Sequence, residues 1–300
     1  MKNSSYIKDL EKCTVCPRKC KVNRFKNVGF CKASDKLKIA LASLHNWEEP
    51  CISGQKGSGT IFFSYCNLRC VYCQNYEISR GYGKEISVNR FSEICLELQE
   101  KGAHNINLVT PTHYVPQIIE GINSARKRGL NIPIVYNTGG YELVETIKKL
   151  EGIIDVYLTD LKYYNHLYAE KYSNAKNYFE ITTKAIEEMF HQVGEPIIED
   201  SIMKKGIIVR VLLLPGLVED AKKIVKYLYD KYKDKIFISI MNQYTPVVET
   251  PYEELNKKVN IEDYNELVDY AYDLGVRNAF VQDDDASDTC FIPKFDKRGV

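Results

Sequence analysis

The sequence lacks the features that mark membrane, exported and nucleic-acid-binding proteins. It has no apolar run of the roughly 18 residues that a membrane-spanning helix needs, and residues 1–10 contain no apolar core of an export signal. Its 41 Lys and Arg are balanced by 40 Asp and Glu, so no basic excess indicates binding to nucleic acid or to an anionic membrane. We therefore expect a cytoplasmic protein with neither a nucleic-acid partner nor a membrane partner.

Cysteine, in contrast, is abundant, with ten residues in a chain of 300. In a reducing cytoplasm this many cysteines indicate metal binding more often than disulfides. Seven of them form two groups, between residues 13 and 31 and between residues 66 and 73. Of the other three, we interpret Cys95 as a core residue and Cys290 as a spare thiol, whereas Cys51 either replaces a ligand of one group or lies near a substrate.

Hydrophobic periodicity predicts an α/β fold from residue 60 onward. Short apolar runs rich in β-branched residues alternate with stretches in which apolar residues recur at the spacing of an amphipathic helix. This alternation predicts a parallel sheet covered by helices, either an incomplete TIM-like barrel or a doubly wound sheet. The predicted strands are 60–65, 105–110, 132–137, 153–159, 207–214, 236–241 and 279–281, and the predicted helical stripes are 91–98, 115–122, 221–228 and 264–271.

Composition divides the chain further. Residues 1–36 are rich in Lys, Arg and Cys but poor in large apolar residues, which predicts a small cysteine-rich module that a metal would stabilise. Residues 37–59 end in a Gly- and Ser-rich stretch and are expected to be a linker. Residues 60–300 would then form the main domain with a C-terminal extension.

Cys66, Cys70 and Cys73, which we call the triplet, form a CxxxCxxC pattern directly after the first predicted strand. Three thiolates on one short loop can hold three irons of a cubane iron–sulfur cluster, and without a fourth cysteine on the loop one iron stays open to another ligand. Zinc is the alternative, although a structural zinc site needs four ligands. The spacing therefore favours an iron–sulfur cluster.

The triplet with Tyr72 resembles the signature of radical S-adenosylmethionine (SAM) enzymes. Residues 66–75 (CNLRCVYCQN), 45–54 (HNWEEPCISG) and 16–22 (CPRKCKV) resemble the subgroup related to pyruvate formate-lyase activating enzyme. The resemblance, which covers residues 13–245, implies an incomplete (β/α)6 barrel and a [4Fe–4S] cluster whose open iron binds SAM. It also implies reductive cleavage of SAM to methionine and a 5′-deoxyadenosyl radical, which takes a hydrogen atom from the substrate.

The resemblance places SAM against the polar ends of the predicted strands. It implies contacts of Asp160 and Lys162 with the methionyl group, where a carboxylate can pair with the SAM ammonium and a lysine with the SAM carboxylate. An internal pair between Asp160 and Lys162 is the alternative. The other residues that it implies for SAM are Tyr72 and Asn75 near the adenine, Asn137 and Thr138 at the ribose, and Arg210 ahead of Pro215 and Gly216.

One departure from the family pattern concerns the SAM amino group. Members of the family usually have a Gly-Gly-Glu-like motif after the second strand, whereas this chain has Thr110, Pro111, Thr112 and His113. The hydroxyl groups of Thr110 and Thr112, together with backbone carbonyls, can supply similar contacts. His113 either joins them, faces the substrate or makes a local hydrogen bond at the start of a helix.

Cys13, Cys16, Cys20 and Cys31, which we call the quartet, have the spacing of a second metal site. Four thiolates can close a tetrahedral zinc site or hold a second iron–sulfur cluster. Disulfides or four unused thiols are the alternatives. Zinc would make residues 1–36 a structural clip, whereas a second cluster would serve as an electron relay or as the site of a redox partner.

We therefore expect a radical SAM enzyme, with a glycyl radical enzyme as one candidate protein substrate. Modification of a small molecule or of another protein residue is the alternative within this class. A non-catalytic iron–sulfur electron carrier and a zinc-dependent binding module are the alternatives outside it. By resemblance, flavodoxin or ferredoxin is the electron donor, and the sensitivity of an open cluster to oxygen predicts anaerobic or microaerobic life.

Overall fold

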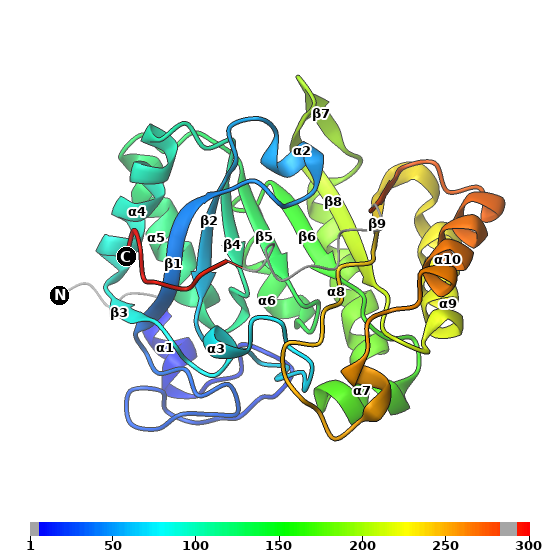
Figure 1. Ribbon diagram of the computed structural model, residues 1–300. Helices are drawn as coiled ribbons and strands as arrows, with labels where there is room; N and C mark the ends of the chain where they lie inside the picture. The colour runs from blue at the N-terminus through cyan, green and yellow to red at the C-terminus, as the bar shows by residue number, and fades with distance from the viewer. Residues whose placement is uncertain (1–5, 283–292) are drawn as a thin grey trace.

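The computed structural model describes residues 6–282 and 293–300. Its centre is one sheet with the strand order β10-β9-β8-β6-β5-β4-β2-β1-β3, and β7 pairs with β8 beside this path (Figure 1). The strands are β1 (Leu37–His45), β2 (Ser58–Phe63), β3 (Lys84–Ile86), β4 (Ile106–Val109), β5 (Ile134–Thr138), β6 (Val156–Asp160), β7 (Ile197–Glu199), β8 (Ile202–Leu212), β9 (Phe237–Met241) and β10 (Ala279–Val281).

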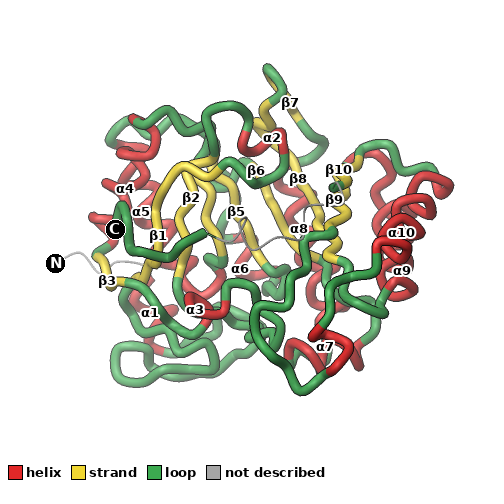
Figure 2. Tube along the Cα trace, in the orientation of Figure 1, coloured by secondary structure: helices red, strands yellow, loops and turns green. Residues whose placement is uncertain are grey.

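Helices connect the strands and cover the outer face of the sheet (Figure 2). The α-helices are α1 (Tyr6–Glu11), α2 (Pro50–Ser53), α3 (Tyr76–Ser79), α4 (Val88–Glu100), α5 (Val115–Lys127), α6 (Val144–Lys148), α7 (His166–Ser173), α8 (Tyr178–Val193), α9 (Val218–Tyr232) and α10 (Ile261–Leu274). Short 3₁₀ helices are η1 (Thr112–Tyr114), η2 (Lys233–Lys235) and η3 (Glu253–Asn256). None of the described helices combines the length and the apolar character that crossing a membrane requires.

The strands from β2 to β10 along this order are parallel neighbours, whereas β1 is antiparallel to both β2 and β3. The two ends of the strand order, β10 and β3, are not paired with each other, so the sheet does not close. This arrangement confirms the predicted α/β fold and favours the incomplete TIM-like barrel over the doubly wound sheet.

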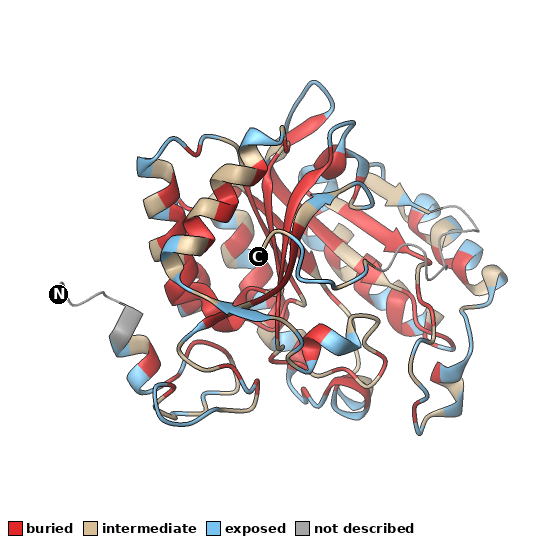
Figure 3. Ribbon diagram, turned by 60° about the vertical axis from the view of Figure 1, so that its left-hand side comes forward, coloured by how far each residue is buried: buried red, intermediate tan, exposed pale blue. Residues whose placement is uncertain are grey.

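The central strands are buried because helices pack outside the sheet and other segments of the chain cover its inner side. All residues of β2, β4 and β5 are buried (Figure 3). On the outer face, α5 turns a stripe of Val115, Ile118, Ile122 and Ala125 inward, as its helical periodicity predicts. Cys95 lies on the corresponding buried face of α4, which agrees with its interpretation as a core residue.

The expectation of a linker at residues 37–59 was wrong. This segment contains β1, α2 and the start of β2, and only the short connections at residues 46–49 and 54–57 are irregular. The Gly- and Ser-rich composition was misleading because Gly59 is needed inside a strand. A Cβ atom there would lie 2.8 Å from the carbonyl oxygen of Asn105, so only glycine allows this close approach of the backbone.

The two ends of the parallel strands are closed differently. At one end α2 buries Cys51 and Ile52 in an apolar cluster with Val135, Val156 and Leu158. At the other end lie the triplet loop, α3 and the N-terminal segment, which Figure 1 shows in cyan and blue along the lower edge of the molecule. Cys51 therefore packs among apolar side chains, whereas Cys290 lies outside the described residues.

Candidate active site

A cavity of about 920 Å³ runs along the inner face of the sheet. One wall is the segment 45–54, which leads from β1 into α2, and another is formed by residues 74–75, which follow the triplet. Asn137, Arg210 and Ser239 line the cavity from β5, β8 and β9. The cavity therefore connects the end of the triplet loop with polar side chains on successive strands, where barrel-like parallel sheets place their active sites.

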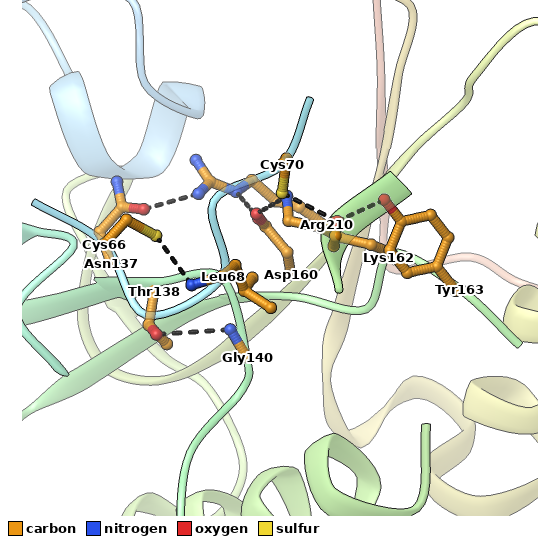
Figure 4. A network of polar contacts seen from close by, with 12 residues as sticks. Cys66, Leu68, Cys70, Asn137, Thr138, Gly140, Asp160, Lys162, Tyr163 and Arg210 are labelled. Carbon is orange, nitrogen blue, oxygen red and sulfur yellow. Dashed lines mark hydrogen bonds and ion pairs between the residues drawn. The ribbon is translucent and has the colours of Figure 1, made fainter. Parts of the chain in front are cut away.

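Arg210 is the centre of a buried charge network on the cavity wall (Figure 4). Its guanidinium donates from Nε to Oδ1 of Asp160 at 2.8 Å and from Nη2 to Oδ1 of Asn137 at 2.6 Å. It also pairs with Glu48, with 3.5 Å between Nη1 and Oε2, and Lys162 pairs with the second oxygen of Asp160. The register of β6 and β8 places Asp160 directly beside Arg210, which explains why residues 50 positions apart meet.

The network keeps its members charged. Burial alone would raise the pKa of Asp160, but Arg210 and Lys162 outweigh it and hold this pKa below its ordinary value. Burial likewise acts to lower the pKa of Lys162, but Asp160 and the nearby Cys70 thiol raise it. At neutral pH the site thus presents an ionised carboxylate and a protonated amine side by side, which can bind a zwitterionic group such as the methionyl end of SAM.

Glu48 and Glu49 extend the network from the other wall of the cavity, and the sequence analysis did not assign them to the site. Glu48 accepts a hydrogen bond from Asn107 Nδ2 at 3.0 Å. Glu49 is buried, and its Oε2 has no hydrogen-bond partner among the described residues. Burial raises the pKa of both carboxyl groups, against the opposing effect of Arg210. The signal that could have revealed them is two adjacent acidic residues within an otherwise apolar stretch, 47–52.

The triplet thiols lie near one another at the end of β2. The charge on Cys70 acts on both Cys66 and Cys73, and that on Cys66 acts on Cys73. Burial is the main cause of the raised pKa of Cys66. It also raises the pKa of Cys73 to about 12. Thiolates at these positions therefore require a positively charged partner, which bound metal supplies.

Hydrogen-bond donors point at the triplet sulfur atoms. The Leu68 N–H donates to Cys66 Sγ at 3.4 Å, and the Ser173 hydroxyl donates to Cys70 Sγ at 2.9 Å. The Asn75 N–H donates to the third sulfur. Such donors stabilise thiolate ligands and tune cluster potentials. Three thiols of this kind on one loop fit the donor set of a [4Fe–4S] cluster with one open iron.

Asn75 and Tyr72, which the resemblance places near the adenine, differ in whether they line the cavity. Asn75 lines the cavity directly after the triplet. Tyr72 is buried outside the cavity lining, and its hydroxyl lies 2.7 Å from that of Tyr163, which in turn lies 2.7 Å from Ser173 Oγ. Tyr72 therefore supports the triplet loop through Ser173, the donor to Cys70.

Thr110, Thr112 and Thr138, at the ends of β4 and β5, do not line the cavity. The hydroxyl groups of Thr112 and Thr138 both donate to Oε1 of buried Glu142, at 2.5 and 2.6 Å. Burial raises the pKa of Glu142 to about 7. Thr110 has a φ of 59°, a left-handed conformation that is rare for a β-branched residue, and its N–H donates to the Asn137 carbonyl at 2.8 Å. These residues therefore stabilise the ends of the strands through hydrogen bonds within the protein.

His113 is buried and joins two segments of backbone rather than facing the cavity. Its Nε2 lies 2.9 Å from the Ser64 carbonyl, and its own carbonyl accepts a hydrogen bond from Arg24. Burial lowers the pKa of His113 to about 3, so the imidazole is neutral. His113 therefore makes a long-range contact in place of the contacts with SAM, with the substrate or with a helix start that the sequence left open.

The quartet lies in the loops that precede β1. Cys13, Cys16 and Cys31 are buried, and Cys20 is half-buried. Cys16 interacts with Cys13 and Cys31, and Cys31 interacts with Cys13 and Cys20, so all four thiols belong to one group. Across the described residues, however, no three Cys, His, Asp or Glu side chains are arranged to hold a single metal ion. A metal at the quartet therefore remains a prediction.

Comparison with known proteins identifies the class to which this fold and site belong. The family model described as the radical SAM superfamily matches residues 60–228, more than half of the chain. The chain therefore belongs to the radical SAM superfamily, whose members are enzymes that use a [4Fe–4S] cluster and SAM and need an electron donor. The match begins at β2 and includes the triplet, Asp160 and Arg210.

Individual proteins resemble this chain in sequence or in fold. The protein MJ0674 of Methanocaldococcus jannaschii is 29% identical over 269 residues, which cover 86% of this chain and 74% of the relative. Two crystal structures of Streptococcus suis SuiB, bound to the precursor peptide SuiA and to SAM, are 14% identical, with TM-scores of 0.51 and 0.50. Each match covers 73% of this chain but only 47% and 48% of SuiB, so the chain spans about half of that protein, and the likeness concerns the fold alone.

Proposed function

We propose that Cys66, Cys70 and Cys73 hold the [4Fe–4S] cluster of this radical SAM enzyme and that the adjoining charge network binds SAM. The proposal rests above all on one observation, the position of the Asp160 and Lys162 pair, which Arg210 joins to the cavity wall and which interacts electrostatically with Cys70. When bound, the cluster supplies the electron that cleaves SAM to methionine and a 5′-deoxyadenosyl radical.

The side chains of this chain divide the binding of SAM between them. Asp160 offers a carboxylate to the SAM ammonium, and Lys162 offers an amine to the SAM carboxylate. Arg210 fixes Asp160 and Asn137 in place through its two hydrogen bonds. Asn75, which lines the cavity after the triplet, can donate to and accept from the adenine. Burial of the network excludes water and strengthens each of these contacts.

The test is anaerobic reconstitution with iron and sulfide, followed by dithionite and SAM. We expect 5′-deoxyadenosine and methionine in equal amounts from the native chain and none above background from Cys66→Ala. A matched control is Cys95→Ala, which removes a buried thiol outside both groups and should retain product formation. Native protein that binds iron but yields no 5′-deoxyadenosine would contradict the proposal.

We further propose that the substrate is a segment of a protein or peptide. The edge of the cavity includes Trp47 and Val281, whose exposed fractions of 63% and 56% leave apolar surface for a polypeptide to contact. SuiB, which shares the fold, was crystallised with a precursor peptide. Installation of a glycyl radical and modification of another protein residue are two reactions of this kind, and modification of a small molecule is the alternative.

Electron paramagnetic resonance distinguishes these substrates. Incubation with a candidate glycyl radical enzyme should give a glycyl radical doublet, whereas another peptide modification gives a mass change without that signal. Consumption of a small molecule in place of either would overturn the choice of a polypeptide. The electron donor that we propose is flavodoxin or ferredoxin in an anaerobic cytoplasm.

A further inference from the structure

We propose that the quartet holds a second iron–sulfur cluster that receives electrons from a carrier protein and passes them to the triplet. This inference rests on the proposed function, because it takes the triplet as the site to which the electrons go. It adds a second metal site, a role for the N-terminal module and the surface at which electrons enter.

The loops of the module fold back so that the quartet thiols converge. The Cys13 N–H donates to the Val22 carbonyl at 2.9 Å, and the Lys21 N–H donates to the Cys13 carbonyl at 2.8 Å. Gly29 packs so closely on Cys20 that an added Cβ atom would lie 2.8 Å from its sulfur. Four thiols brought together in one module are the donor set of an iron–sulfur cluster or of zinc.

The quartet and the triplet share a local hydrogen-bond pattern. In the triplet, Cys66 and Cys73 accept from the N–H two residues further along the chain. In the quartet, Cys16 and Cys31 do the same, with the N–H groups of Arg18 and Ala33 as donors. Cys20 accepts from the Phe30 N–H at 3.3 Å. Backbone N–H groups aimed at sulfur stabilise thiolate ligands of either metal.

The arrangement of the side chains favours a cluster over zinc. Neither cysteine group, among the residues that the structure describes, has the compact arrangement of a single-ion site. A cubane cluster distributes its ligands over several irons and does not need that arrangement. The quartet therefore matches the triplet in its hydrogen-bond donors, although the two groups differ in spacing and in the number of thiols.

Arg18 links the two groups directly. It lies two residues from Cys16 and two from Cys20, a stretch that spans at most about 7 Å. Its side chain donates to the Asn67 carbonyl at 2.8 Å and to the Leu68 carbonyl at 3.5 Å, both between the first two cysteines of the triplet. A zinc clip that stabilised only its own module would not need this contact, whereas an electron relay requires the two sites to be close.

A second contact strengthens this link. The ring of Phe30, next to Cys31, packs against the guanidinium of Arg18 at 3.9 Å and that of Arg69 at 5.3 Å. Arg69 belongs to the triplet loop, so cation–π contacts join residues beside a ligand of each group. The module is thus fixed against the triplet loop, as a short electron path requires.

The surface around the quartet is basic, which suits an acidic carrier protein. Residues 1–36 contain ten Lys and Arg but only three Asp and Glu, although the whole chain is nearly neutral. Opposite charge on a partner accelerates association and orients it at the docking surface. The exposed lysines among the described residues of the module are Lys8, Lys12, Lys19, Lys21, Lys26, Lys32 and Lys36.

The electron balance is simple. A reduced acidic one-electron carrier gives one electron to the oxidised quartet cluster, which then gives one electron to the oxidised cluster at the triplet. The carrier ends oxidised, the quartet cluster returns to its starting state, and the triplet cluster ends reduced. No bond forms or breaks and no proton is transferred in either step.

The first test uses a variant in which Cys66, Cys70 and Cys73 are all replaced by Ala. After anaerobic reconstitution we expect about four irons per chain and a paramagnetic signal on reduction, because only the quartet site remains. Zinc at the quartet, or a folded variant without metal, would overturn the proposal. Should that variant not fold, Cys20→Ser supplies the same test, since it should lose about half of the iron of the native chain.

The second test compares two reductants for SAM cleavage. Cys20→Ser should lose the activity driven by a reduced acidic flavodoxin and retain a much larger share of the activity driven by dithionite. Equal losses with both reductants would overturn the relay. A native chain that cleaves no SAM even with dithionite would instead contradict the proposed function, so the two failures are distinguishable.

Discussion

The triplet and the quartet are two groups of cysteines with similar hydrogen bonds and different surroundings. The triplet has three thiols, and the residues that follow it open onto a cavity lined by charged side chains. The quartet has four thiols in loops with a basic surface. Three ligands leave an iron open for chemistry, whereas four ligands complete a cluster that can only transfer electrons. The ligand count and the surroundings therefore point to the same division of roles.

The largest effect that should separate the two regions comes from Arg210→Ala. Removing this cation leaves Glu48 and Glu49 buried without a cationic partner and Asp160 with Lys162 alone, which should cost about 3–5 kcal/mol in the free energy of unfolding and abolish SAM binding. The quartet does not depend on this network, so its iron should remain. Chemical denaturation, SAM binding and iron analysis measure these effects.

Arg210→Lys is the matched control, because it keeps the charge and loses only the forked geometry. It should recover most of the stability and part of the SAM affinity. The loss of unfolding free energy in Arg210→Ala should be smaller at low pH, because the carboxyl groups then take up protons. Loss of the quartet iron along with SAM binding would show that the two regions do not act separately.

An effect of intermediate size concerns Glu142, which lies close in the chain to residues that contact the triplet loop and the module. Glu142 follows Tyr141, whose carbonyl accepts from Asn67 of the triplet loop, and Thr146 on the next helix donates to Val15 of the module. Because burial raises the pKa of Glu142 from 4.5 to about 7, the folded chain binds more protons than the unfolded chain between these values. Stability should therefore fall by about 3 kcal/mol as the pH rises through this window and level off above it.

Glu142→Gln should remove this part of the pH dependence. The amide keeps the size of the side chain and can accept the hydrogen bonds of Thr112 and Thr138 without ionising. Urea denaturation of both chains between pH 4.5 and 7 compares the slopes. An identical slope in the variant would mean that another group causes the dependence.

The smallest effect concerns the basic surface of the module. Charge reversal of Lys19 and Lys21, which flank Cys20, should slow SAM cleavage driven by the acidic carrier on the order of tenfold at low ionic strength. The difference should largely disappear in high salt, and the dithionite-driven rate serves as the reference. Lys101→Glu, an exposed substitution after α4, is the control. If both variants cleave SAM at the same carrier-driven rate, electrons enter at another surface.

Most of the fold could be predicted because the helical and strand periodicities are strong. The predicted strands correspond to β2, β4, β5, β6, β8, β9 and β10, with ends displaced by up to five residues. The failure at residues 37–59 has a physical reason. Glycine and serine usually indicate loops, but Gly59 lies in a strand because a neighbouring backbone leaves no room for a side chain.

The site was predicted less completely. Spacing alone indicated the triplet, because three ligands on one loop need no tertiary information. Glu48 and Glu49 were missed because their contacts cross from the β1–α2 connection to β4, β5 and β8. Thr112 and Thr138 were expected at SAM, yet their hydroxyl groups bond to Glu142, a carboxylate whose position the sequence pattern does not indicate.

The sequence by itself determined the chemistry that this protein can perform, since the identity and spacing of its cysteines are local properties of the chain. Only the tertiary structure decided which charges share the cavity and that Arg18 joins the module to the triplet loop. Such contacts depend on strand register and on packing between distant segments, and no local pattern encodes them. The relation between the two cysteine groups is therefore a property of the fold.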